Sequence, residues 1–135
     1  MSVADLVFRD PSVLHPNDSL RTAAEALALA HADLLPVCDR GRLVGALGER
    51  DLVDHGLARG LNPDAPVQMA MSQYFDWCYL DETTETVAAR FRDADIETLL
   101  VVDRHHRLVG VIARQHLTPE MRDVWAATDL ERQAA

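Results

Sequence analysis

The chain carries one stretch of sequence twice, and this duplication constrains its fold more than any other feature. Residues 34–52 and 99–117 share an Asp-Arg pair followed by Arg-Leu-Val-Gly, with one residue added between these two elements in the second copy. An internal repeat of this kind indicates two copies of one structural unit. Because the chain has 135 residues, the two units should share one core, and a second independent domain has no room.

Each copy has the pattern of a β-hairpin that leads into a helix. In the first copy, two apolar runs of strand length, 34–38 and 43–47, flank a polar turn at 39–41 that contains a glycine. Such a turn between two apolar runs is typical of a hairpin, so the strands should be antiparallel neighbours. After the second strand the apolar residues recur at helical spacing, which predicts a helix over about 49–59.

A short strand and a helix are predicted before each hairpin. Apolar trios at 13–15 and 77–79 are of strand type. The first helix should span about 20–31 behind an N-cap at Ser19 or Asp18, and its apolar face is Leu20, Ala23, Ala24, Leu27 and Ala30. The second helix should be capped by Thr83 or Thr84, with Val87, Ala88, Phe91 and Ala94 at the corresponding positions. A last helix is predicted over 115–125.

The combined pattern predicts an α+β (α/β) fold of two pseudo-symmetric β-α-β-β-α repeats packed sheet to sheet. Repeat 1 is expected at 1–60 and repeat 2 at 67–126, because a linker rich in Gly, Pro, Asn and Asp occupies 61–66. A polar tail is expected at 127–135. Neither repeat alone buries enough apolar surface, so the two should form one globular module. Their pairing leaves two related clefts, each beside a helix N-terminus that attracts anions.

Charge and composition exclude several classes of partner. The formal net charge is −9, which repels nucleic acid and anionic membranes. No apolar run approaches the roughly 18 residues of a membrane-spanning helix, and the N-terminus lacks the features of a secretory signal, so a cytoplasmic location is expected. Cys38 and Cys78 lie in predicted strands, where buried reduced thiols are the favoured interpretation.

The repeated residues resemble those of the cystathionine-beta-synthase (CBS) domains, which occur as tandem pairs. The resemblance covers residues 3–125 and rests on Pro36-Val37 at a strand start, an Asp-x-x-x-Leu-Val-Gly hairpin ending at Gly45, and a Gly-x-x-x-x-x-Asp pattern ending at Asp51. It implies a stand-alone Bateman-type regulatory module that binds AMP, ADP, ATP or S-adenosylmethionine between its repeats. The sequence has no nucleophile elbow or P-loop, so no enzyme is predicted.

The family's ligand-binding signature is Gly-h-x-Thr/Ser-x-x-Asp, in which h is apolar and the resemblance assigns the Asp to the ribose hydroxyls. The first copy retains Asp51 but has Gly48 at the hydroxyl position. In the second copy Ala113 and His116 replace both groups, so this cleft is expected to be degenerate. Asp51 also has a structural interpretation, because a carboxylate at the third helical position can accept the N–H of Gly48 as a cap.

Further candidate residues have two interpretations each. Arg50 either reaches a phosphate or remains solvated, and Arg114 has the same alternatives in the second copy. The stretch 31–35, which enters the strand at Pro36, lies where the resemblance places the adenine, and Leu34 and Leu35 also fit a plain core. The six histidines show no metal-ligand spacing, so no metal site is predicted.

Two functions remain open from the sequence. The first is a sensor in which an adenosyl ligand at Asp51 shifts the packing of the repeats, and a regulated partner protein reads that shift. The second is a ligand-free scaffold for dimerisation or protein interaction, favoured by Gly48, Ala113 and His116. The resemblance also implies a homodimer, whose interface would suit Trp125, Leu57 and Leu61.

Overall fold

The computed structural model describes residues 2–114 of the chain. The elements of its first half are η1 (Val3–Asp5), α1 (Leu20–Ala30), β1 (Leu34–Asp39), β2 (Arg42–Gly48), α2 (Glu49–Asp51) and the π-helical η2 (Leu52–Leu57). Those of its second half are η3 (Val67–Met69), β3 (Trp77–Tyr79), α3 (Thr84–Asp93), β4 (Thr98–Val102) and β5 (Leu108–Ala113). None of the helices within the described residues is long and apolar enough to cross a membrane.

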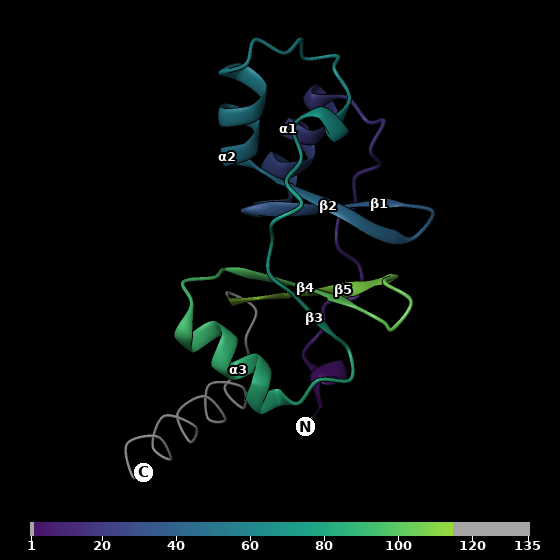
Figure 1. Cartoon of the computed structure of the whole chain (residues 1–135), viewed down its shortest axis with the longest axis vertical. Coiled ribbons are helices and arrows are strands. Elements are labelled where there is room, and N and C mark those ends of the chain that lie inside the picture. The colour runs from purple at the N-terminus through teal and green to yellow at the C-terminus, as the bar shows by residue number, and fades with distance from the viewer. Residues whose placement is uncertain (1, 115–135) are drawn as a thin grey trace.

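Two small sheets face each other at the centre of the molecule, and the helices lie outside them (Figure 1). One sheet is the antiparallel hairpin β1–β2, and the other has the order β3-β4-β5, with β3 parallel and β5 antiparallel to β4. The predicted fold class and sheet-to-sheet packing are therefore confirmed. The strand predicted at 13–15 is reduced to one parallel bridge, between Leu14 and Val37.

The two long helices begin where the sequence predicts. The Ser19 hydroxyl accepts the N–H of Thr22 at 3.0 Å and caps α1, and the Thr83 hydroxyl accepts the N–H of Thr86 at 3.1 Å and caps α3. The predicted apolar faces are too wide, because Ala24, Ala30 and Ala94 are exposed. Small alanine side chains fit either environment, so helical spacing did not distinguish them. The helix predicted over 115–125 lies outside the described residues.

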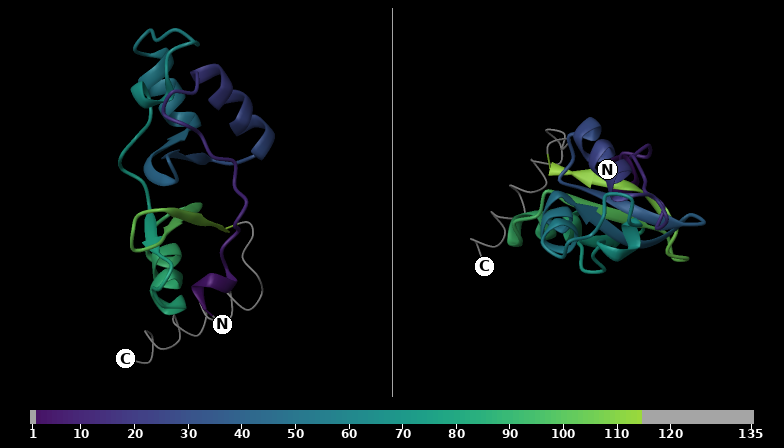
Figure 2. Two further views of the ribbon diagram at one scale, coloured as in Figure 1. Left: turned by 90° about the vertical axis from the view of Figure 1, so that its right-hand side faces the viewer. Right: turned by 90° about the horizontal axis from the view of Figure 1, so that it is seen from above.

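The first segment of each repeat packs into the core of the other half. Val3 lies in a buried cluster with Cys78, Val87 and Phe91, although it precedes them by most of the chain. Reciprocally, Val67 and Ala70 lie in the cluster that contains Leu20, Leu27, Leu35 and Leu47. Figures 1 and 2 show the N-terminus beside the half that contains α3. Each spatial half therefore contains the first segment of the other repeat.

The crossed segments lie close to the two glycines of the repeated Leu-Val-Gly sequence. Phe8 forms an antiparallel bridge with Val111, and Ser72 forms the equivalent bridge with Ala46. A Cβ on Gly45 would lie 2.7 Å from the Met71 Sδ, and a Cβ on Gly110 would clash with the carbonyl oxygen of Phe8. Glycine is therefore required at Gly110, where the crossing backbone lies directly against it. At Gly45 the nearest atom belongs to the flexible Met71 side chain, and the carbonyl oxygen of Ser72 lies at 3.1 Å.

The tips of the two hairpins also join the halves. Arg42 and Arg107 form an antiparallel bridge, in which the Leu43 N–H donates to His106 O and the Leu108 N–H donates to Gly41 O, both at 3.0 Å. Arg42 and Arg107 occupy equivalent positions in the two repeats. A contact between equivalent residues lies on the approximate twofold axis that relates the two halves.

Candidate functional site

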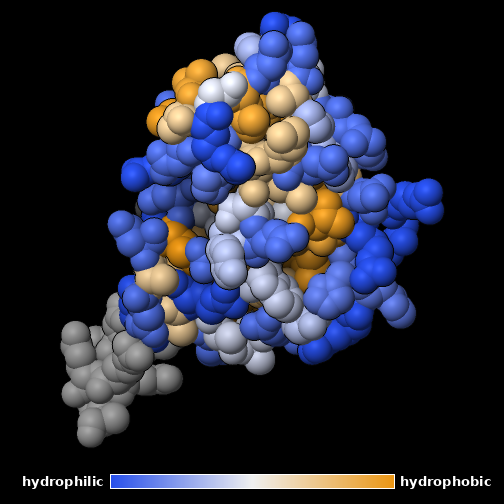
Figure 3. All heavy atoms as spheres, turned by 45° about the horizontal axis from the view of Figure 1, so that its top comes forward, coloured by the Kyte–Doolittle hydropathy of each residue, from blue (hydrophilic) through white to orange (hydrophobic). Residues whose placement is uncertain are grey.

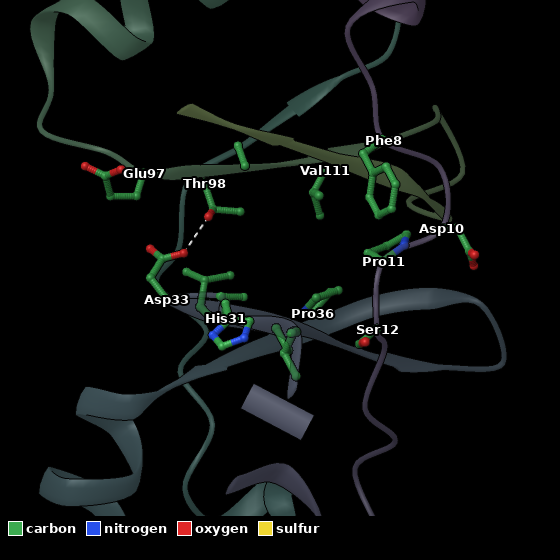
Figure 4. Close-up of a pocket in the computed structure, with 15 residues that line it drawn as sticks. Phe8, Asp10, Pro11, Ser12, His31, Asp33, Pro36, Glu97, Thr98 and Val111 are labelled. Atoms are coloured by element: carbon green, nitrogen blue, oxygen red, sulfur yellow. Dashed lines mark hydrogen bonds between the residues drawn. The ribbon is translucent and has the colours of Figure 1, made fainter. Parts of the chain in front are cut away.

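A cavity of about 450 Å³ lies between the two sheets (Figure 4). Its volume is within the range of small-molecule sites. Both repeats line it, through Phe8, Asp10, Pro11, Ser12, Ala30, His31, Ala32, Asp33, Leu34, Leu35, Pro36, Glu97, Thr98, Val111 and Ala113. The pocket is therefore a property of the paired repeats, and neither repeat contains it alone.

Two segments of the chain are held around this pocket by specific backbone features. The Phe8–Val111 bridge holds the segment 8–12 against β5. The segment 30–36 turns toward the pocket after α1, where His31 ends the helix in the left-handed conformation with φ 52°. Figure 4 shows Pro36 and Val111 on opposite sides of the cavity, with Phe8 at one end. Two apolar side chains therefore border the cavity from opposite sheets.

One end of the pocket is closed by a hydrogen bond between the halves. The Thr98 hydroxyl donates to the Asp33 carboxylate at 2.5 Å, as Figure 4 shows. Nearby, the Glu97 carboxylate lies 3.7 Å from the Arg114 guanidinium. Carboxylates at 10, 33 and 97 thus surround an apolar interior. Such carboxylates can accept hydrogen bonds from hydroxyl groups of a ligand.

The structure groups the predicted site residues differently from the sequence analysis. Leu35 and Pro36, assigned to the first cleft, line the pocket together with Ala113, assigned to the second. Gly48, Arg50 and Asp51 are not among the lining residues. The pocket thus draws on residues that the sequence analysis assigned to two clefts, because it combines the turn region of one repeat with the second hairpin strand of the other. His116 lies outside the described residues.

Asp51 has the contacts of a helix cap. Its Oδ2 accepts the Gly48 N–H at 2.9 Å, as the structural interpretation expected, and its Oδ1 lies 3.5 Å from His55 Nδ1. The same ring nitrogen lies 3.0 Å from the carbonyl oxygen of Ala70, in the crossed segment of the second repeat. Asp51 therefore stabilises the junction between β2 and the following helix.

Arg50 and Arg114, the two candidate phosphate ligands, form hydrogen bonds within the chain. Arg50 Nε donates to Asp54 at 2.7 Å on the exposed face of the helix, and this hydrogen bond raises the Arg50 pKa. The Arg114 guanidinium donates to the carbonyl oxygens of Phe91, at 2.8 Å, and Ile96, at 3.1 Å. Arg114 therefore ties β5 to the end of α3.

Several pocket residues escaped the sequence analysis. Phe8, Pro11 and Ser12 precede the first predicted strand and were given no role there, and Thr98 lies just before another predicted strand. Phe8 precedes Arg9 in the sequence, and the structure leaves its large apolar side chain 50% exposed. An exposed aromatic residue beside a cavity is typical of a binding surface.

The two cysteines are buried and are not disulfide-bonded, as predicted. Burial raises the pKa of the Cys38 thiol to about 11. For Cys78 burial is again the main cause, assisted by the negative charge of Glu82, and the pKa rises to about 12. Both groups are therefore neutral thiols near pH 7 and act as small core residues, not as nucleophiles.

Two α+β repeats, related by an approximate twofold axis and enclosing a pocket at their junction, define a tandem-repeat binding module. The chain belongs to the CBS domain family, whose model matches residues 3–58 and 67–123. The CBS domain-containing protein YhcV of Bacillus subtilis is 27% identical over 112 residues, which cover 83% of this chain and 79% of YhcV. The chain spans only 22% of another relative, the L-aspartate semialdehyde sulfurtransferase of Methanocaldococcus jannaschii.

Solved structures show the same fold. The CBS domain protein PAE2072 from Pyrobaculum aerophilum, solved in complex with AMP, has a TM-score of 0.77 and 23% sequence identity, covering 94% of this chain and 99% of that one. The CBS domain pair of MJ0100, in complex with 5′-methylthioadenosine and S-adenosylmethionine, has a TM-score of 0.70 and 26% identity. That match covers 86% of this chain and 91% of the other.

Proposed function

We propose that this chain is a non-catalytic, cytoplasmic sensor module that binds an adenosyl compound in the pocket between its repeats. The observation that carries the proposal is the cavity of about 450 Å³, which residues of both halves line. The AMP complex of PAE2072 and the 5′-methylthioadenosine and S-adenosylmethionine complex of MJ0100 support this class of ligand. The candidates are therefore AMP, ADP, ATP, S-adenosylmethionine and 5′-methylthioadenosine.

The arrangement of the pocket suggests which residues would bind each part of the ligand. An adenine ring would lie between Pro36 and Val111, which face each other across the cavity (Figure 4). Asp33 would accept a ribose hydroxyl, in the way proposed for Asp51 from the sequence. Because the ligand would touch both halves, it would favour the arrangement of the halves that binds it more tightly, and a partner protein could read that arrangement.

A thermal-shift panel of the five candidate ligands, with GTP for comparison, tests this function. A ligand at 100 times its Kd should stabilise the fold by about 2.7 kcal/mol. Val111→Phe should abolish the shift by filling the pocket. Val53→Phe is the matched control, because Val53 is 47% exposed in η2 and does not line the pocket. If none of the adenosyl compounds shifts the wild-type transition, the sensor function is wrong.

A second candidate function, the dimerisation scaffold, is supported by exposed apolar residues on two helices. Leu29 and Leu57 are 83% and 75% exposed on α1 and η2, which contact each other. The surface in Figure 3 is mainly hydrophilic with separate hydrophobic patches. Of the other predicted interface residues, Leu61 packs partly into the core and Trp125 lies outside the described residues.

The scaffold hypothesis predicts a homodimer through the exposed sides of α1 and η2, which carry Leu29 and Leu57. Light scattering after gel filtration should give twice the chain mass for the wild type, and Leu57→Glu should shift it toward the monomer. Tyr74→Glu is the control, since Tyr74 is 95% exposed and lies on neither helix. A monomeric wild type at micromolar concentration would count against the scaffold.

A further inference from the structure

The pocket has a structural counterpart elsewhere in the molecule. The duplication places Pro36 opposite Leu100 in the alignment of the repeats, Val111 opposite Ala46, and Pro11 opposite Phe75. The crossed bridges obey the same equivalence, since Phe8–Val111 corresponds to Ser72–Ala46. A second cleft would therefore be lined by Ala46, Leu100 and the segment that carries Phe75.

The chain itself packs into this second cleft. Ala46 and Leu100 form a buried cluster with Val111, which also lines the open pocket, and Phe75 and Trp77 pack against this cluster. Ala46 and Leu100 are 2% and 0% exposed. The equivalent position in the open pocket is Pro11, whose ring is much smaller than the Phe75 side chain. Among the positions that differ between the two clefts, this one places an aromatic side chain where the open pocket has a proline.

We propose that Phe75 is an internal plug that closes the second cleft and leaves each chain with one ligand site, the pocket beside Pro11. The proposal deepens the proposed function and rests on it for the identity of the ligand. Asp51 does not line the open pocket, and its Oδ2 accepts the N–H of Gly48. Retention of this signature residue therefore does not mark the open site.

Thiol labelling tests the plug without any ligand. Val111→Cys and Ala46→Cys place a thiol at equivalent positions of the open and the closed cleft. With methyl methanethiosulfonate, the Val111→Cys thiol should react at least about tenfold faster than the Ala46→Cys thiol, since reaction at a closed site waits for local opening. The wild-type chain supplies the background, because its own cysteines are buried.

Adding Phe75→Ala to Ala46→Cys should remove that protection. The expected result is a rate close to that of Val111→Cys. Equal rates at the two positions while Phe75 is present would overturn the plug, and so would a rate at Ala46→Cys that Phe75→Ala leaves unchanged.

Calorimetric titration with AMP and with 5′-methylthioadenosine then counts the sites. The wild type should bind one molecule per chain, and Pro11→Phe should weaken binding at least about tenfold by plugging the open pocket as Phe75 plugs the other. Val13→Phe is the matched control, since Val13 is 46% exposed in the same segment and does not line the pocket. Two molecules per wild-type chain, or unchanged binding by Pro11→Phe, would overturn the inference. If neither compound binds, the proposed function fails, and the labelling rates alone decide whether Phe75 closes the cleft.

Discussion

Phe8 and Val111 are backbone partners across the junction of the two halves. The Phe8 N–H donates to Val111 O at 2.8 Å, and the Val111 N–H donates to Phe8 O at 3.0 Å. Both residues also line the pocket. The contact that joins the N-terminal segment to β5 therefore also shapes the site, and disturbing it should affect stability and binding together.

Gly110→Ala tests this relationship. The new Cβ would clash with the carbonyl oxygen of Phe8 and lie 2.5 Å from Val7 Cγ1, so the crossing segment must move. We expect a loss of about 2–3 kcal/mol in the free energy of unfolding, measured by urea titration, and weaker ligand binding.

Gly56→Ala is the control for that substitution. A Cβ at Gly56 meets only Leu20 Cδ1, at 3.6 Å, and the residue is helical. Alanine should therefore be neutral or stabilising by up to about 1 kcal/mol. Equal effects of the two substitutions would show that the crossing segment does not require glycine.

Asp51→Ala should show whether Asp51 caps the helix or binds the ligand. Loss of the hydrogen bond to the Gly48 N–H should cost about 1 kcal/mol of stability, while ligand affinity at the open pocket stays within a factor of about two. Asp54→Ala removes an exposed carboxylate one turn later and should cost less. A large loss of affinity in Asp51→Ala would return the site to the cleft that the signature suggested.

The Thr98–Asp33 hydrogen bond should couple the two halves. Thr98→Val and Asp33→Ala, measured singly and together, form a double-mutant cycle. A coupling energy of about 0.5–1 kcal/mol is expected, because the bond is at the pocket rim and partly exposed to water. Strictly additive effects would mean that the bond does not join the halves in solution.

Because the two buried thiols have raised pKa values, we expect the free energy of unfolding to fall at alkaline pH. In the unfolded chain a thiol ionises near pH 9, whereas burial raises the pKa to about 11 for Cys38 and about 12 for Cys78. Between these values the unfolded state binds fewer protons, so the free energy of unfolding falls as pH rises above 9, by about 1 kcal/mol per thiol at pH 10. Urea titrations at pH 8 and pH 10 should show a smaller drop for Cys38→Ala and Cys78→Ala than for the wild type. An identical drop would assign the effect to other groups.

Much of the local structure was predictable because it depends on neighbouring residues. The caps at Ser19 and Thr83, the hairpin before Gly48 and the cap at Asp51 all follow from short-range spacing. The pocket did not follow, because Phe8 and Val111 are distant in sequence and nothing in either segment identifies its partner. The repeat predicted that clefts would exist but did not predict which segments would share one.

The sequence alone determined that two copies of one unit fold together, since the same turns, caps and apolar periods occur twice and act locally. Only the tertiary structure decided that each repeat lends its first segment to the other half, which brings Pro36 and Ala113 to one pocket and leaves Asp51 outside it. The physical reason is that burial rewards any apolar segment that fills a core, whichever repeat supplies it. Val3 and Val67 are equally suited to either core by their chemistry, and the path of the chain between the sheets assigns each to the opposite half.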